Sequence, residues 1–140
     1  MPFLLDANAC IALINGRDHA AREHFNAERA AGQSIQVSSI AEFGLWYGVG
    51  KSQHRDRNAE RLRAFFKGPV DVLAFDSEGA EAAGLVRADL ESKGRPIGPY
   101  DLLIAAQAVR RNLTLVTANH TEFSRIKDLH WVDWTKPRRK

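Results

Sequence analysis

Short apolar runs alternate with longer helical segments along the whole chain, and this order constrains the fold more than any other feature. Five runs have the length and apolar character of buried strands: 3–5, 35–37, 70–74, 113–117 and 129–132. Alternation of this kind is typical of parallel strands joined by helical crossovers. The sequence therefore predicts an α/β fold, a single three-layer domain in which a central parallel sheet of about five strands carries helices on both faces.

The segments between these strands have the spacing and end signals of helices. The predicted helices occupy residues 8–14, 17–31, 39–46, 55–67, 77–93 and 99–109. Gly44 and Gly48 interrupt the third of them, so we end it near Trp46, and we expect a loop or a short helix at 119–125.

Length and composition favour one ordinary globular domain. The chain has 140 residues, of which 44% are hydrophobic and 26% charged. No apolar run is long enough to span a membrane and the N-terminus has no secretory pattern, so we expect a cytoplasmic protein without a membrane partner. The single cysteine, Cys10, allows no intramolecular disulfide, and we expect it to be a buried small residue.

The positive charge is concentrated at the C-terminal end. Four of the basic residues that give the net charge of +3 lie within 136–140, so the rest of the chain is close to neutral. We divide the chain into a domain at 1–135 and a basic tail at 136–140. Such a tail can contact phosphate groups or can be a solvated end, and the sequence leaves both interpretations open.

Three polar residues stand where a parallel α/β sheet binds its ligands. Asp6 ends the first predicted strand, Asn119 follows the fourth, and Asp101 lies in the first turn of the apolar helix that precedes the fourth strand. Ligands bind beyond the carboxyl ends of the strands, where the strand order reverses. If the first and fourth strands are neighbours at that point, the three side chains converge. The simpler interpretation of Asp101 is a residue that only caps its helix.

Two converging carboxylates would repel each other unless one is protonated or a cation lies between them. Because the donors are oxygen atoms, that cation would be Mg²⁺ or Mn²⁺, with Asp6 and Asp101 as its ligands. Such a site can activate water for in-line displacement at phosphorus. The histidines have no zinc-binding spacing and the chain has no glycine-rich nucleotide loop, which argues against those two kinds of site.

Four motifs resemble those of the PIN-domain ribonucleases of the VapC toxin type. They are Leu4-Leu5-Asp6-Ala7-Asn8, Arg95-Pro96-Ile97-Gly98-Pro99-Tyr100-Asp101, the run 115–123 with Asn119, and Leu45-Trp46-Tyr47-Gly48 followed by Lys51-Ser52. The resemblance spans nearly the full chain. It implies a PIN-like domain with endoribonuclease activity, Mg²⁺ or Mn²⁺ at Asp6 and Asp101, and structured RNA such as tRNA as substrate. It also implies a homodimer that a VapB-type antitoxin inhibits.

The second acidic position of that family falls on Gly44, and the nearest carboxylate is that of Glu42. Two residues along a helix correspond to about 200° of rotation, so the two positions face nearly opposite ways. Ser39 and Glu42 also have the spacing of a capping box. Two interpretations of Glu42 stay open, a helix-capping residue and a third catalytic acid. We favour the second, because two acids alone hold a cation weakly, and we predict catalytic roles for Asp6, Glu42, Asp101 and Asn119.

Two other functions fit the residues. The empty acidic position is compatible with a catalytically weak PIN-like module that binds RNA or protein. A phosphoryl-transfer domain with Asp6 as acceptor is the other, although the dehalogenase-type phosphatases have an Asp two residues later, where this chain has Asn8.

Overall fold

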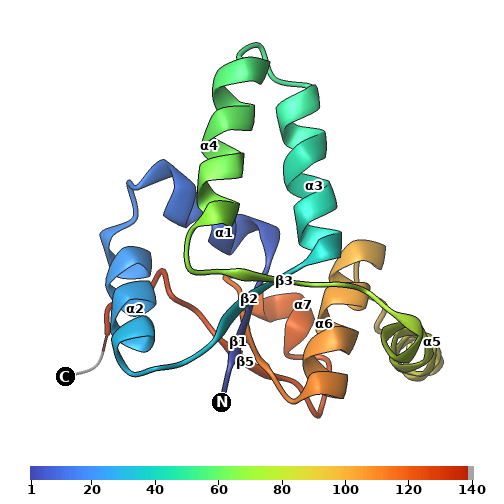
Figure 1. Ribbon diagram of the computed structural model, residues 1–140. Coiled ribbons are helices and arrows are strands. Elements are labelled where there is room, and N and C mark those ends of the chain that lie inside the picture. Colours follow the sequence, from blue (N-terminus) through green and yellow to red (C-terminus); the bar gives the residue numbers. More distant parts are fainter. Residues whose placement is uncertain (139–140) are drawn as a thin grey trace.

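The computed structural model describes residues 1–138 and confirms the predicted α/β architecture (Figure 1). Residues 139–140 of the predicted basic tail lie outside the described residues. Five strands form one parallel sheet in the order β3-β2-β1-β4-β5. They are β1 (Phe3–Leu5), β2 (Ile35–Ser38), β3 (Asp71–Leu73), β4 (Thr114–Val116) and β5 (His130–Val132).

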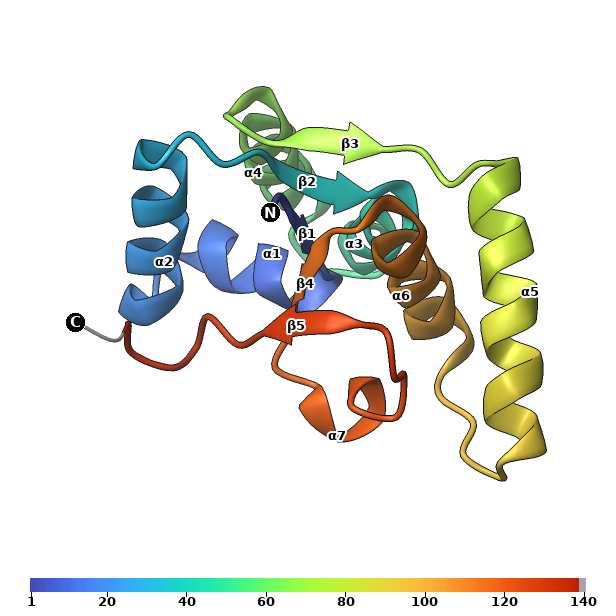
Figure 2. The same ribbon diagram turned by 90° about the horizontal axis from the view of Figure 1, so that it is seen from below.

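Seven helices connect these strands within the described part of the chain. They are α1 (Ala7–Asn15), α2 (His19–Ala30), α3 (Ser39–Gly50), α4 (Arg55–Lys67), α5 (Ser77–Ser92), α6 (Pro99–Arg111) and α7 (His120–Phe123). Helices α3 and α4 form a hairpin that rises from the sheet (Figure 1). Seen from below, α2 lies at one end of the sheet and α5 at the other, with α6 beside α5 (Figure 2). Helix α1 packs against α2, α3 and α4, and α5 packs against α6.

The strand order reverses between β1 and β4, as the sequence analysis required. The chain passes from β1 to β2 and β3 in one direction, then returns to add β4 and β5 on the opposite side of β1. Leu5 is paired in register with Val37 of β2 and Val116 of β4, and all three side chains are buried. The residues that follow Leu5 and Val116 therefore leave the sheet side by side, at the point where parallel α/β folds bind ligands.

Helix α3 begins at Ser39, as predicted, but it ends later than predicted and has a different N-cap. It continues to Gly50, because Trp46 and Val49 pack against the hydrophobic core and outweigh the weak helix propensity of the glycines. Its N-cap is Ser38, whose hydroxyl accepts a hydrogen bond from the backbone N–H of Ile40 at 3.0 Å. The Ser39 hydroxyl instead accepts from the backbone N–H of Phe75. Of the two interpretations of Glu42, the capping box with Ser39 is therefore wrong.

The last described segment is fixed to the domain by Trp134, which is only 3% exposed. Its ring lies 5.3 Å from that of Phe3 and stacks at 5.9 Å on that of His24, and the His24 imidazole is hydrogen-bonded to the carbonyl oxygen of Lys136. Cys10 is buried, as predicted. Among residues 1–138, none of the helices has the length and apolar character that crossing a membrane requires.

Candidate functional site

Asp6 is a buried carboxylate at the carboxyl end of β1. It is also the N-cap of α1, and its Oδ1 accepts a hydrogen bond from the backbone N–H of Ala9 at 2.8 Å. Burial raises the pKa of Asp6, and the negative charges of Asp101 and Asp133 act in the same direction. Hydrogen bonds from Thr117 and Ala9 oppose this shift of the pKa. The local fold thus positions Asp6 at the expense of desolvating its charge.

Asp101 lies in the first turn of α6, directly after Pro99. Proline suits this place because its fixed φ fits a helix and its missing N–H would have no helical partner there. Partial burial raises the pKa of Asp101, and so does the negative charge of Glu122, while a hydrogen bond from Asn119 lowers it. Asp101 and Asp6 therefore lie in one environment, in which the negative charge of Asp101 also raises the pKa of Asp6.

Asn119 connects the second carboxylate to a third. Its Nδ2 donates to Oε2 of Glu122 at 2.9 Å and lies 3.4 Å from Oδ2 of Asp101. Its backbone N–H donates to the Thr117 hydroxyl at 3.0 Å. The other oxygen of Glu122 accepts from the backbone N–H of Gly98, just before α6. These bonds from Asn119 and Gly98 lower the pKa of Glu122, so this carboxylate stays ionised and holds the start of α6 in place.

Asp6 and Asp101 face a common cavity of about 310 Å³. The structure thus confirms that Asp6, Asp101 and Asn119 converge at the switch point. Apart from the two carboxylates, the lining is mainly apolar and aromatic: Ala7, Asn8, Ile40, Ala41, Phe43, Gly44, Tyr47, Tyr100 and Ile104.

Glu42 is not brought to the acidic pair. The α3 residues that line the cavity include Ile40, Phe43, Gly44 and Tyr47, which lie on one face of the helix, and Glu42 is not among the lining residues. A Cβ atom added at Gly44 would meet nothing within 4 Å. The position that faces Asp6 and Asp101 is therefore Gly44, and it is open.

The sequence analysis missed Thr117, Glu122 and Asp133. Thr117 and Asp133 directly follow β4 and β5, so the rule that selected Asp6 would also have selected them. Glu122 lies one helical turn after Asn119, a spacing at which side chains meet. Only the folded chain shows that the partners of Glu122 include the segment before α6.

The residues fit a hard divalent cation. Neither Asp6 nor Asp101 forms an ion pair with Lys or Arg in the described chain, so their charges lack a protein counterion. Within residues 1–138, no group of three His, Cys, Asp or Glu side chains is arranged to hold a metal. Mg²⁺ needs no such group, because it is commonly held by one or two carboxylates and keeps several waters.

Comparisons with known proteins agree with this geometry. The PIN domain family model matches residues 3–129. The tRNA(fMet)-specific endonuclease VapC of Shigella flexneri is 38% identical, an alignment that covers 96% of this chain and 99% of that protein. Ribonuclease VapC2 of Rickettsia felis is also 38% identical, with 97% of this chain and 100% of the relative covered.

Solved structures extend the similarity to three dimensions. The crystal structure of VapBC2 from Rickettsia felis, bound to a DNA fragment from its promoter, contains a chain that superposes with a TM-score of 0.89 at 35% identity. That alignment covers 96% of this chain and 99% of the other. DNA-bound VapBC from Salmonella typhimurium gives a TM-score of 0.87 at 38% identity, with 96% and 98% of the two chains covered.

Proposed function

The chain belongs to the PIN-domain family and to its VapC branch, and from this premise we propose that it is a metal-dependent endoribonuclease, the toxin of a toxin–antitoxin pair. The observation that carries the proposal is the pair of carboxylates, Asp6 and Asp101, in one cavity at the switch point of the sheet. The named activities of the relatives give the reaction, the hydrolysis of phosphodiester bonds in RNA. We propose structured RNA such as tRNA as the substrate and the cytoplasm as the place where the protein meets it.

The charge of the cavity supports metal dependence. Among residues 1–138, the charged residues that line it are Asp6 and Asp101, so the free site repels a phosphodiester. A bound Mg²⁺ or Mn²⁺ would supply neutralisation of the phosphate charge and activation of the attacking water. Because the donor set consists of oxygen atoms, we assign both carboxylates as ligands of this ion.

The chain's own residues prepare the site for hydrolysis. The fold holds Asp6 in position as a ligand, because its Oδ1 accepts a hydrogen bond from the backbone N–H of Ala9 while its charge lies in the cavity with Asp101. Asn119 is a positioning residue, since its amide orients Asp101 and Glu122 together.

The relatives also indicate the partners. The similar crystal structures are complexes named VapBC, and we propose that this chain binds a VapB-type antitoxin and forms a homodimer. The acidic cavity is a suitable target for a basic antitoxin segment, because an arginine can pair with carboxylates through two hydrogen bonds.

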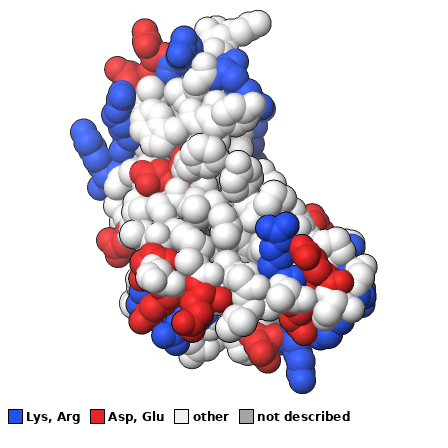
Figure 3. All heavy atoms as spheres, turned by 90° about the vertical axis from the view of Figure 1, so that its right-hand side faces the viewer, with Lys and Arg blue, Asp and Glu red and all other residues white. Residues whose placement is uncertain are grey.

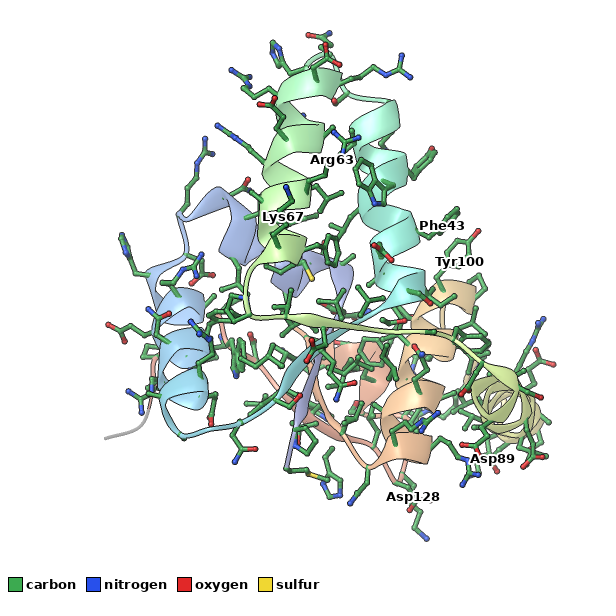
Figure 4. The ribbon with its side chains drawn as sticks, in the orientation of Figure 1. Phe43, Arg63, Lys67, Asp89, Tyr100 and Asp128 are labelled. Atoms are coloured by element: carbon green, nitrogen blue, oxygen red, sulfur yellow. The ribbon has the colours of Figure 1, made fainter. Side chains whose placement is uncertain are left out.

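Cleavage of RNA by the purified chain tests the proposal. We expect tRNA to be cut with Mg²⁺ or Mn²⁺, cleavage to stop with EDTA, and Asp101→Asn to be inactive although folded. Asp128→Asn is the matched control, because this exposed carboxylate lies in a loop away from the cavity (Figure 4). Cleavage that persists in EDTA, or an Asp101→Asn protein with full activity, would contradict the assignment.

One observation favours a second candidate, a catalytically weak module that binds RNA or protein. Gly44 leaves open the position where the family has an acid, so the cavity holds one carboxylate fewer. The two candidates predict different rates of RNA cleavage. An RNA-binding chain that cuts no tRNA at any concentration of Mg²⁺ or Mn²⁺ would favour the module.

A further inference from the structure

Three aromatic side chains surround the mouth of the acidic cavity and remain largely exposed. Phe43 and Tyr47 lie one turn apart on α3, and Tyr100 lies in the first turn of α6. Their exposed fractions are 55%, 63% and 58%, although all three line the same cavity as Asp6 and Asp101. Core packing therefore does not explain these rings, and they are available to a ligand.

Two of the rings form a pair across the two helices. The centroids of Phe43 and Tyr100 are 5.6 Å apart with an interplanar angle of 54°. Figure 4 shows both side chains pointing to the same side of the molecule. Figure 3 shows that side in space-filling form, and its middle is largely uncharged, with most charged side chains gathered above and below. The Nζ of Lys51 lies 4.8 Å from the centroid of the Tyr47 ring, so a positive charge borders the aromatic group.

We propose that Phe43 and Tyr100 stack an unpaired nucleobase beside the phosphodiester held at Asp6 and Asp101, and that they thereby select unpaired RNA. This inference rests on the proposed ribonuclease function and adds a specificity site to it. Proteins bind single-stranded RNA by stacking bases on aromatic rings, with basic side chains near the backbone phosphates. A base inside a duplex is already stacked and paired, so the rings cannot reach its faces. A nucleotide in a loop can place its base on the rings while its phosphate enters the cavity.

The position of the rings favours RNA over a protein partner. They share the cavity with the two carboxylates, so the base or ribose of a nucleotide bound there for cleavage lies within reach of the rings. Lys51 supplies a positive charge at the outer end of the aromatic group, where the RNA backbone would leave the cavity. Aromatic faces with an adjacent cation match the chemistry of a nucleotide strand.

Binding of a fluorescent RNA tests the stacking directly. The probe is a synthetic stem–loop with 2-aminopurine in its loop, and the proteins carry Asp101→Asn so that the RNA remains intact. We expect Phe43→Leu and Tyr100→Leu to weaken binding by roughly 5- to 150-fold, the range for losing one stacked base. Phe43→Tyr and Tyr100→Phe should bind as the parent does. Leu85→Ala is the control for loss of an exposed apolar side chain, since Leu85 is 68% exposed on α5.

A coupling experiment separates stacking from a structural role. An abasic nucleotide is placed at each loop position in turn, and one position should weaken binding to the parent protein by a similar factor. At that position Phe43→Leu should cause no further loss, because ring and base act as one pair. If the loss of affinity from the abasic nucleotide and the loss from Phe43→Leu multiply at every loop position, the proposal is overturned. Unchanged RNA binding with impaired binding of a co-expressed antitoxin would also overturn it and assign the rings to a protein interface. Binding is measured without cleavage. A wild-type chain that cuts no RNA would therefore contradict the proposed ribonuclease function without contradicting the stacking site.

Discussion

Replacing Asp6 by asparagine should stabilise the metal-free protein while removing its metal response. The carboxylate is 5% exposed, lies near Asp101 and Asp133, and has no basic partner among the described residues. Asparagine caps helices as well as aspartate does, so the hydrogen bond from Ala9 can persist. The substitution therefore removes mainly the buried charge and leaves the local fold intact.

The sign of the effect follows from the raised pKa of Asp6. A folded-state pKa above the unfolded value means that the native protein binds the proton more tightly. The associated stability is fully present below the unfolded pKa and is lost as the pH rises through the folded pKa. Above the folded pKa the wild-type protein therefore carries the destabilising charge, and Asp6→Asn does not. In strong acid, below the unfolded pKa, the two proteins should have similar stability.

The magnitude depends on how well the charge is solvated. An unsatisfied buried polar group costs about 1–3 kcal/mol, and two hydrogen bonds already offset part of the cost at Asp6. We expect a gain of about 1–2 kcal/mol near pH 7, or roughly 2–8 °C in Tm for a domain of this size. Mg²⁺ at 100 times its Kd should stabilise the wild-type protein by about 2.7 kcal/mol. The order of stability should therefore reverse when Mg²⁺ is added.

Urea unfolding followed by circular dichroism, near pH 7 and in acid, with and without Mg²⁺, measures these differences. Asp18→Asn is the matched control, because Asp18 caps α2 with the same bond at 2.9 Å but lies outside the cavity. The reasoning would be refuted if Asp6→Asn were less stable than the wild-type protein without metal. Equal stabilisation of both proteins by Mg²⁺ would show that the ion does not bind Asp6.

Three further substitutions test separate parts of the site and the fold. Gly44→Glu should raise Mg²⁺ affinity and the rate of RNA cleavage, because the position faces the cavity and has space; a slower enzyme with weaker Mg²⁺ binding would contradict this. Glu42→Ala should leave the cleavage rate per folded molecule near that of the wild type, whereas loss of a catalytic acid would lower it on the order of 10²-fold or more. Trp134→Ala should lower the free energy of unfolding by about 3–5 kcal/mol in urea titration, because it empties a buried aromatic contact, and a loss below about 1 kcal/mol would show that the contact is dispensable.

The order of the elements and the meeting of the acids could be predicted because both depend on local patterns and topology. Each strand falls in a short run rich in apolar residues that is separated from the next by a helical segment, and parallel connections leave few possible arrangements. Asp6 and Asp101 were selected because one follows a strand and the other begins a helix at the predicted reversal of strand order. The sequence was sufficient to identify these two residues, because their places at the end of a strand and the start of a helix determine where they lie in the fold.

Contacts between distant segments could not be predicted. Ser39 matches the capping-box pattern, but its hydroxyl is occupied by Phe75, thirty-six residues away, and Ser38 caps the helix instead. Glu122 joins the site through its bond to Gly98, a contact across twenty-four residues. The direction in which Glu42 points depends on how α3 is rotated about its own axis, and the packing of α3 against the rest of the fold determines that rotation. In each case a tertiary contact either overrode the local sequence pattern or added a partner that the pattern does not contain.

Anomalous diffraction from crystals soaked with Mn²⁺ tests the central claim most directly. The metal should give one or two peaks between the carboxylates of Asp6 and Asp101, with waters completing its coordination and no contact to Glu42. A peak at any other site, or none at a Mn²⁺ concentration that supports cleavage of RNA, would contradict the assignment of this cavity as the catalytic centre.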